Sequence, residues 1–107
     1  MKFKVHLLSD AEEDLFDIYR YVASNDSESK AMRLIQKFEK LCYSLEELPN
    51  RGHIPPELEE IGIFDYLEIH YKPYRIIYQI IENSVFVHCI LDGRKDMEEI
   101  LYRRFIR

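Results

Sequence analysis

The sequence predicts an α+β fold in which helices pack on one face of an antiparallel sheet. Two observations lead to this prediction. A short alternating segment at 3–8 is followed by two stretches whose apolar residues recur at three- and four-residue spacing, as in amphipathic helices. Three segments rich in Ile, Val and Tyr then follow at 63–71, 74–81 and 85–91, as expected for strands. The predicted order is an N-terminal strand, an antiparallel helical hairpin, a three-stranded antiparallel meander and a short C-terminal helix.

The first helix is expected directly after the strand "FKVHLL". Ser9 followed by Glu12 fits a capping box, in which both side chains satisfy backbone N–H groups at the start of a helix. The acidic residues near this start suit the positive end of the helix dipole and need no catalytic role. The apolar stripe of this helix is Ala11, Leu15, Ile18, Tyr19 and Val22.

The polar segment "SNDSES" (24–29) is expected to end the first helix and to cap a second, longer one. Pro49 is expected to stop the second helix, and 49–62 is then a loop rich in Pro and Gly. A link this short predicts antiparallel packing of the two helices. The apolar stripe of the second helix is Ala31, Leu34, Ile35, Phe38, Leu41, Cys42, Leu45 and Leu48.

Turn-sized connections at 72–73 and 82–84 predict that the last three strands pair in antiparallel order. The segment 96–105 is predicted as the closing helix. Within the strand 74–81, alternation sends Arg75 to the face opposite Tyr74 and Ile76. Since one face of the sheet lies under the helices, we expect the Arg75 face to be partly open.

Length and composition favour a folded domain that spans residues 1–107. The 47% hydrophobic content excludes a disordered chain. No apolar run approaches the roughly 20 residues that cross a bilayer, and no signal peptide is evident at the start. We therefore expect no membrane contact and a cytoplasmic location.

The net charge of −5 argues against direct nucleic-acid binding, which depends on Lys and Arg at phosphates. Cys42 and Cys89 lie within apolar patterns and are expected to be buried, reduced thiols. The histidines do not show the spacing of metal ligands, so we expect no metal and no cofactor. These four histidines are His6, His53, His70 and His88.

Arg75 has three explanations from the residues alone. It pairs with a carboxylate such as Asp65 or Glu68, it contacts a protein partner, or it binds a phosphate. The Arg94-Lys95 pair follows the last strand and is either a solvated loop or part of a basic surface. Such a surface would also include Arg103 and Arg104.

The segments "DAEEDLFDIYRYV", "LPNRGHIPPEL", "YRIIYQI" and "ILDGRKDMEEIL", in this order, resemble the RelE/ParE superfamily of type II toxin–antitoxin toxins. The resemblance covers nearly the whole chain. It implies a microbial-RNase-like α+β fold and neutralisation by a small antitoxin. RelE-like members cleave mRNA on the ribosome with a cluster of basic residues, whereas ParE-like members, known from plasmid stabilisation, poison DNA gyrase.

One departure from the RelE pattern favours ParE over RelE. Arg75 and Arg94 or Lys95 match basic positions of the superfamily, but the strand "FDYLEIH" carries Glu68 where RelE-like enzymes place lysines. An RNase must stabilise negative charge on a phosphate, and Glu68 opposes this. We therefore expect a non-enzymatic, gyrase-binding toxin.

Under this reading the partner-binding residues are Arg75, Arg94, Lys95, Arg103 and Arg104. The first alternative is an mRNA endonuclease in which Arg75, together with Arg94 or Lys95, steadies the phosphate and Tyr102 or His70 is the acid or base. The second alternative is an inert member of the family that retains only antitoxin binding.

Overall fold

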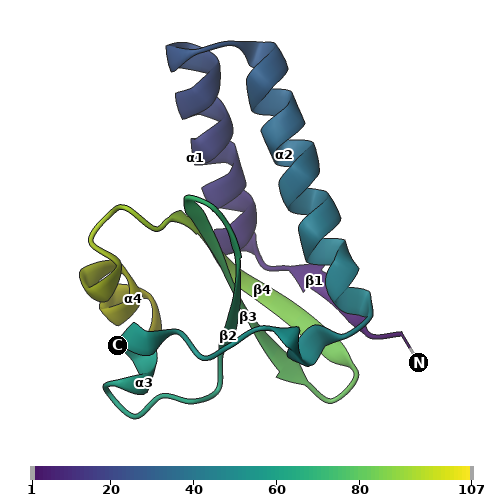
Figure 1. Cartoon of the computed structure of the whole chain (residues 1–107), viewed down its shortest axis with the longest axis vertical. Coiled ribbons are helices and arrows are strands. Elements are labelled where there is room, and N and C mark those ends of the chain that lie inside the picture. Colours follow the sequence, from purple (N-terminus) through teal and green to yellow (C-terminus); the bar gives the residue numbers. More distant parts are fainter. Residues whose placement is uncertain (1, 107) are drawn as a thin grey trace.

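The computed structural model describes residues 2–106. It has an α+β architecture, as the sequence predicted, with an upright helical hairpin above a sheet and two short helices at the side (Figure 1). The elements in chain order are β1 (Lys4–Leu7), α1 (Ser9–Asn25), α2 (Glu28–Tyr43), the 3-10 turns η1 (Ser44–Glu46) and η2 (Pro49–Arg51), α3 (Pro56–Glu59), β2 (Leu67–Tyr71), β3 (Tyr74–Ile81), β4 (Ser84–Asp92) and α4 (Met97–Phe105).

The sheet has four strands in the order β1-β4-β3-β2. The predicted antiparallel meander of β2, β3 and β4 is confirmed. The first strand joins this meander through the last one: β1 pairs in parallel with β4, from Lys4 opposite Ser84 to Leu7 opposite Val87. The sheet is therefore mixed, and its N-terminal strand lies beside β4, which the hairpin α1–α2 covers.

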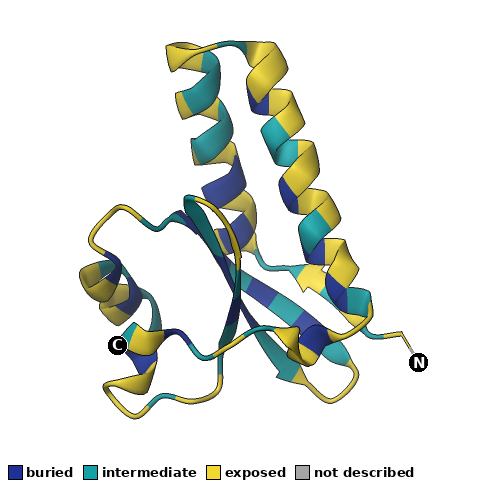
Figure 2. Cartoon of the chain, in the orientation of Figure 1, coloured by how far each residue is buried: buried dark blue, intermediate teal, exposed yellow. Residues whose placement is uncertain are grey.

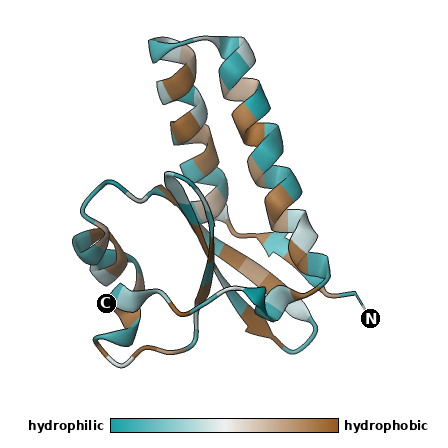
Figure 3. Cartoon of the chain, in the orientation of Figure 1, coloured by the Kyte–Doolittle hydropathy of each residue, from teal (hydrophilic) through white to brown (hydrophobic). Residues whose placement is uncertain are grey.

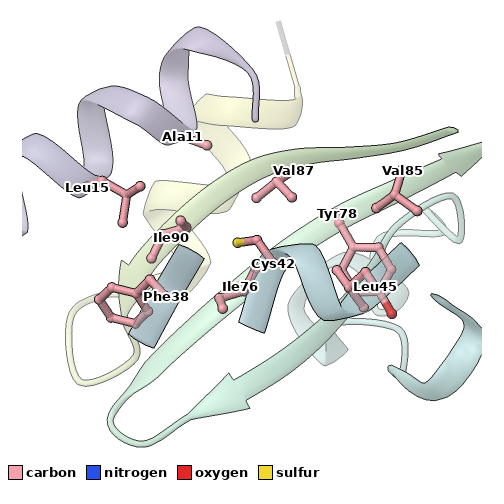
Figure 4. Close-up of a cluster of buried hydrophobic side chains, with 10 residues drawn as sticks. All are labelled: Ala11, Leu15, Phe38, Cys42, Leu45, Ile76, Tyr78, Val85, Val87 and Ile90. Carbon is pink, nitrogen blue, oxygen red and sulfur yellow. The ribbon is translucent and has the colours of Figure 1, made fainter. Parts of the chain in front are cut away.

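The main core lies between this hairpin and one face of the sheet. Figure 4 shows the side chains of α1 and α2 facing those of β3 and β4. Tyr78 is wholly buried here, and its hydroxyl donates a hydrogen bond of 2.5 Å to the Pro49 carbonyl, which satisfies its polar end. The buried cluster comprises Ala11, Leu15, Phe38, Cys42, Leu45, Ile76, Tyr78, Val85, Val87 and Ile90.

The starts and ends of the helices differ from the prediction in two places. The capping box is wrong: Leu8 is the N-cap of α1 and Ser9 is already helical, so the amide of Glu12 bonds to the Leu8 carbonyl at 3.0 Å. The second helix ends at Tyr43 and not at Leu48, because the chain tightens into η1 and Leu48 then adopts left-handed φ of 54° before Pro49. Leu45 nevertheless stays buried, as its apolar spacing predicted.

The second face of the sheet is partly open, as expected: one part is covered, whereas Gln79 is half-buried and Ile81 is 47% exposed. A bulge in β4 shifts the register, so that Ile77 opposes Cys89 while Tyr78 opposes Val87. This turns Cys89 toward the second face, where α3 and α4 cover it. The second cluster comprises Leu58, Ile77, Cys89, Leu91, Met97 and Leu101.

The segment 49–66 supplies part of this cover, so two further predictions are corrected. The predicted loop contains η2 and α3, since Pro56 sits at the first turn of α3, a position that needs no amide donor. The predicted strand 63–71 shortens to β2, because Ile63 and Tyr66 pack against the second cluster and do not pair with β3.

Burial and hydropathy follow these layers. The sides of α1 and α2 near the sheet are buried, whereas the end of the hairpin farthest from the sheet is largely exposed (Figure 2). The strands carry the densest apolar colouring (Figure 3). Within residues 2–106, no helix combines the length and the apolarity that a membrane span requires.

Candidate functional site

Four of the five predicted partner-binding residues surround one surface depression. It lies between α1, the end of β4 and α4, and we call it the α1–α4 groove. Two adjoining hollows form it, and both include Asp17, Ile18, Asp92 and Lys95. The first hollow adds Asp14, Ile90, Leu91, Ile100, Arg103 and Arg104, and the second adds Tyr21, Tyr74 and Arg94.

An ion pair between Asp14 and Arg104 joins the walls of this groove. An Asp14 oxygen accepts a hydrogen bond of 2.5 Å from Arg104 Nη2, and the other accepts one of 3.0 Å from the amide of Ile90. Burial raises the pKa of Asp14, although the hydrogen bond from Arg104 works in the opposite direction. Arg104 therefore connects α4 to α1 and β4, and its role in this contact is structural.

The rim of the groove carries more exposed cations. Arg94 bonds through Nε and Nη2 to the Asp92 carboxylate at 3.0 and 2.8 Å, yet 71% of its side chain is exposed. These bonds from Arg94 lower the pKa of Asp92. Arg103 lies 3.5 Å from Glu99 and is also exposed, as is Lys95. The rim can therefore offer positive charge to a partner.

Arg75 belongs to a different ion-pair group on the α3 side of the sheet. Its Nε and Nη2 donate to Glu68 at 2.6 and 3.0 Å, and Nη1 and Nη2 donate to Glu57 at 2.8 and 2.7 Å. Of the three explanations for Arg75, the structure therefore contains the ion pair with Glu68. The side chain of Arg75 is only 13% exposed and that of Glu68 1%.

Gly93 permits this placement of Arg75. A Cβ atom at Gly93 would lie 2.9 Å from Arg75 Cδ and 2.9 Å from the Pro73 carbonyl oxygen. The chain thus passes close to the stem of Arg75 just before the Arg94-Lys95 pair. The guanidinium of Arg75 bonds to carboxylates from α3 and β2, whereas that of Arg94 bonds to Asp92. Arg75 and Arg94 therefore bond to different carboxylates and do not form one site.

The Arg75 group predicts a specific dependence of stability on pH. Hydrogen bonds from Arg75 lower the pKa of Glu57 below its usual 4.5. A lowered pKa contributes stability above pH 4.5 that is lost as the pH falls through the folded-state value. We expect Glu57→Gln to lower the free energy of unfolding by about 1–2 kcal/mol at pH 7, and this difference to shrink in acid. Urea unfolding at pH 7 and below pH 4.5 measures it; a difference that grows in acid would contradict the assignment.

The histidines form a cluster that sequence reasoning missed. The Nε2 atoms of His53 and His70 lie 3.1 and 3.3 Å from the two oxygens of Glu68. His70 follows Glu68 by two residues on one strand, which was a usable signal, because such residues share a face. His53 gave no signal, because only the fold pairs its backbone with that of Glu68.

The remaining sequence-predicted groups lie apart from both sites. Tyr102 is 57% exposed on α4. Cys42 and Cys89 are both free and buried, as predicted, and burial raises the pKa of each thiol to about 12. These thiols are therefore not nucleophiles near neutral pH.

Comparison with known proteins identifies what this arrangement is similar to. A family model described as the ParE toxin of the type II toxin–antitoxin system parDE matches residues 5–97. No curated protein matches the sequence.

Two solved structures share the fold at low sequence identity. The chromosomal ParDE toxin–antitoxin system of P. aeruginosa has a TM-score of 0.70 at 15% identity, with 83% of this chain and 94% of that chain covered. The toxin–antitoxin complex RelBE2 of Mycobacterium tuberculosis has a TM-score of 0.65 at 14% identity, covering 86% of this chain and 92% of that chain. The prediction of a RelE/ParE fold, closer to ParE, is thereby confirmed.

Proposed function

Because the chain belongs to the ParE toxin family of type II toxin–antitoxin systems, we propose that it inhibits DNA gyrase by protein binding. A cognate antitoxin would neutralise it, and the titles of both similar structures name toxin–antitoxin systems. The proposed site of action is the cytoplasm, where gyrase meets DNA. One observation about Arg75 supports a non-enzymatic mechanism.

The observation that supports a non-enzymatic mechanism is that two carboxylates accept hydrogen bonds from Arg75. Cleavage of RNA requires cations that stabilise extra negative charge on the reacting phosphate. The guanidinium of Arg75 instead makes four hydrogen bonds to Glu57 and Glu68, and two negative charges more than balance its own. A phosphate approaching Arg75 would meet a net negative group. This supports binding over mRNA cleavage.

We assign partner contact to the α1–α4 groove. Arg and Tyr are enriched where proteins bind one another, and this groove combines Arg94 and Arg103 with Tyr21 and Tyr74. Lys95 lines both hollows of the groove and is exposed. A substitution of Lys95 is therefore the best test of whether this groove binds a partner. Arg104 and Arg75 are held in ion pairs with buried carboxylates, so their first task is structural.

A supercoiling assay with purified gyrase tests the proposal. We expect the wild-type protein to inhibit supercoiling, and Lys95→Glu to require about tenfold more protein or more for the same inhibition. Placing like charges together at an interface costs several kcal/mol, and about 1.4 kcal/mol is tenfold in affinity. Arg33→Glu, an exposed site on α2 with the same change in charge, is the matched control and should inhibit normally.

No inhibition at any excess of wild-type protein would overturn the gyrase assignment. The second candidate is then mRNA cleavage, which one observation favours: the imidazole of His70 lies within 3.3 Å of Glu68, beside Arg75. Such a pair could move a proton. Primer extension on mRNA from expressing cells separates the candidates, because codon-linked cuts are expected only of the endonuclease.

A further inference from the structure

We propose that His53, Glu68 and His70 form a binding site for a transition-metal ion of the zinc type. This inference is independent of gyrase inhibition. It depends on where the backbone places the three side chains, on the geometry of their donor atoms, on the charge around them and on access from solvent.

The backbone fixes all three side chains on one face. The amide of His53 donates to the Glu68 carbonyl at 3.1 Å, and the amide of Glu68 donates to the His53 carbonyl at 2.7 Å. This reciprocal pair sets the two residues opposite each other as neighbours in an antiparallel bridge. His70 shares the face of Glu68 because it lies two residues further along β2.

The donor atoms converge as a metal requires. His53 Nε2 lies 3.1 Å from one Glu68 oxygen and His70 Nε2 lies 3.3 Å from the other. The ligand atoms of the three residues all lie within 4.8 Å of one another. Tetrahedral zinc holds its ligands about 2.0–2.2 Å away, which separates neighbouring donors by about 3.3–3.6 Å. Small side-chain rotations of the two histidines would meet this spacing.

The charge balance leaves Glu68 able to serve as a ligand. Arg75 donates to both oxygens of Glu68, and alone it would neutralise that carboxylate. Glu57 also binds Arg75, with both of its oxygens. With neutral imidazoles, the group of Glu57, Glu68 and Arg75 carries one net negative charge. Arg75 thus acts as an outer partner that orients the ligand, as carboxylate partners do for metal-bound histidines.

The site is accessible, as reversible binding requires. The side chains of His53 and His70 are 60% and 41% exposed, whereas Glu68 lies beneath them. A hollow opens over the three residues and is also lined by Leu41, Arg51 and Ile69. Arg51 is the other cation there, and its guanidinium is held by the hydroxyl and the carbonyl of Ser44. Three protein ligands below a hollow leave a fourth position open to water or to a further ligand.

Direct titration of the full chain with Zn²⁺, in competition with a chromophoric chelator, tests the site. We expect binding of one ion per chain, and we expect Co²⁺ to give the visible absorption of a four-coordinate ion with nitrogen and oxygen ligands. His53→Gln and His70→Gln should each weaken Zn²⁺ binding by more than about 100-fold, because the loss of an outer partner alone costs about 10–100-fold. His6→Gln, a histidine on β1 that stacks on Phe86, is the matched control and should bind normally.

Glu57→Gln probes the charge balance without touching a ligand. It is expected to weaken Zn²⁺ binding about tenfold, as an outer-partner change does. Circular dichroism of each variant confirms that it is folded before titration. If wild-type protein fails to bind Zn²⁺, or if His53→Gln and His6→Gln bind it equally, the proposal is overturned. The two imidazoles would then be hydrogen-bond partners of Glu68 only.

Discussion

Replacing Arg75 by Met is expected to lower the free energy of unfolding by about 3–5 kcal/mol. Among residues 2–106, Arg75 is the arginine whose guanidinium bonds to Glu68, and the side chain of Glu68 is 1% exposed. A buried carboxylate that loses its guanidinium partner is costly, whereas Met keeps an apolar stem of the kind that Arg75 places beside Gly93. Urea unfolding followed by circular dichroism at pH 7 measures the loss.

Two further variants show whether the charge is the cause. Arg94→Met removes an arginine whose side chain is 71% exposed, so it should cost less than about 1 kcal/mol. Adding Glu68→Gln to Arg75→Met removes the stranded charge and should restore part of the stability. If Arg75→Met leaves stability unchanged and abolishes the proposed gyrase inhibition, Arg75 is a partner-binding residue and not a structural one.

Replacing Arg104 by Met is expected to lower the free energy of unfolding by about 2–3 kcal/mol at pH 7. A buried group that loses a charged hydrogen-bond partner typically costs this much. Arg104 bonds to Asp14 at 2.5 Å across the α1–α4 groove, and Asp14 is 7% exposed. The amide of Ile90 still donates to Asp14 in the variant, which keeps the expected loss below that for Arg75.

The loss at Arg104 should depend on pH in a defined direction. Burial raises the pKa of Asp14 above its usual 3.8, so ionisation of Asp14 weakens the folded state as the pH rises through the folded-state value. Removing Arg104 makes that ionisation costlier. The difference between wild type and Arg104→Met should therefore be largest at neutral pH and shrink as Asp14 is protonated. Arg103→Met, at an exposed i,i+4 pair with Glu99, is the control and should cost less than about 0.5 kcal/mol at any pH.

Local pattern was sufficient to predict most of the elements. The spacing of Leu15 and Phe38 identified two amphipathic helices, and the short turn at 82–84 identified the β3–β4 pair. The ends of elements were less predictable. Leu45 and Leu48 continue the helical spacing, yet the chain leaves the helix at Tyr43, because the backbone turns there before Pro49. Apolar spacing reports which face is buried and does not report where the helix ends.

The site was predictable only in part, for the same kind of reason. Lys95, Arg103 and Arg104 are basic and close in sequence, and they line one groove. Their partners were not predictable: Asp14 is 90 residues from Arg104 and Glu57 is 18 from Arg75. The alternation of the strand predicted on which face Arg75 lies. It could not predict that α3 would bring a second carboxylate, that of Glu57, to Arg75.

Short-range periodicity and ordered motifs were sufficient to predict the α+β class, the helical hairpin, the antiparallel meander and the family. Three features appear only in the folded chain: β1 pairs in parallel with β4, α3 and α4 cover part of the second face, and His53 and His70 converge on Glu68. Those outcomes depend on contacts between residues far apart in the chain. Their free energy comes from burial and charge pairing, which no local pattern contains.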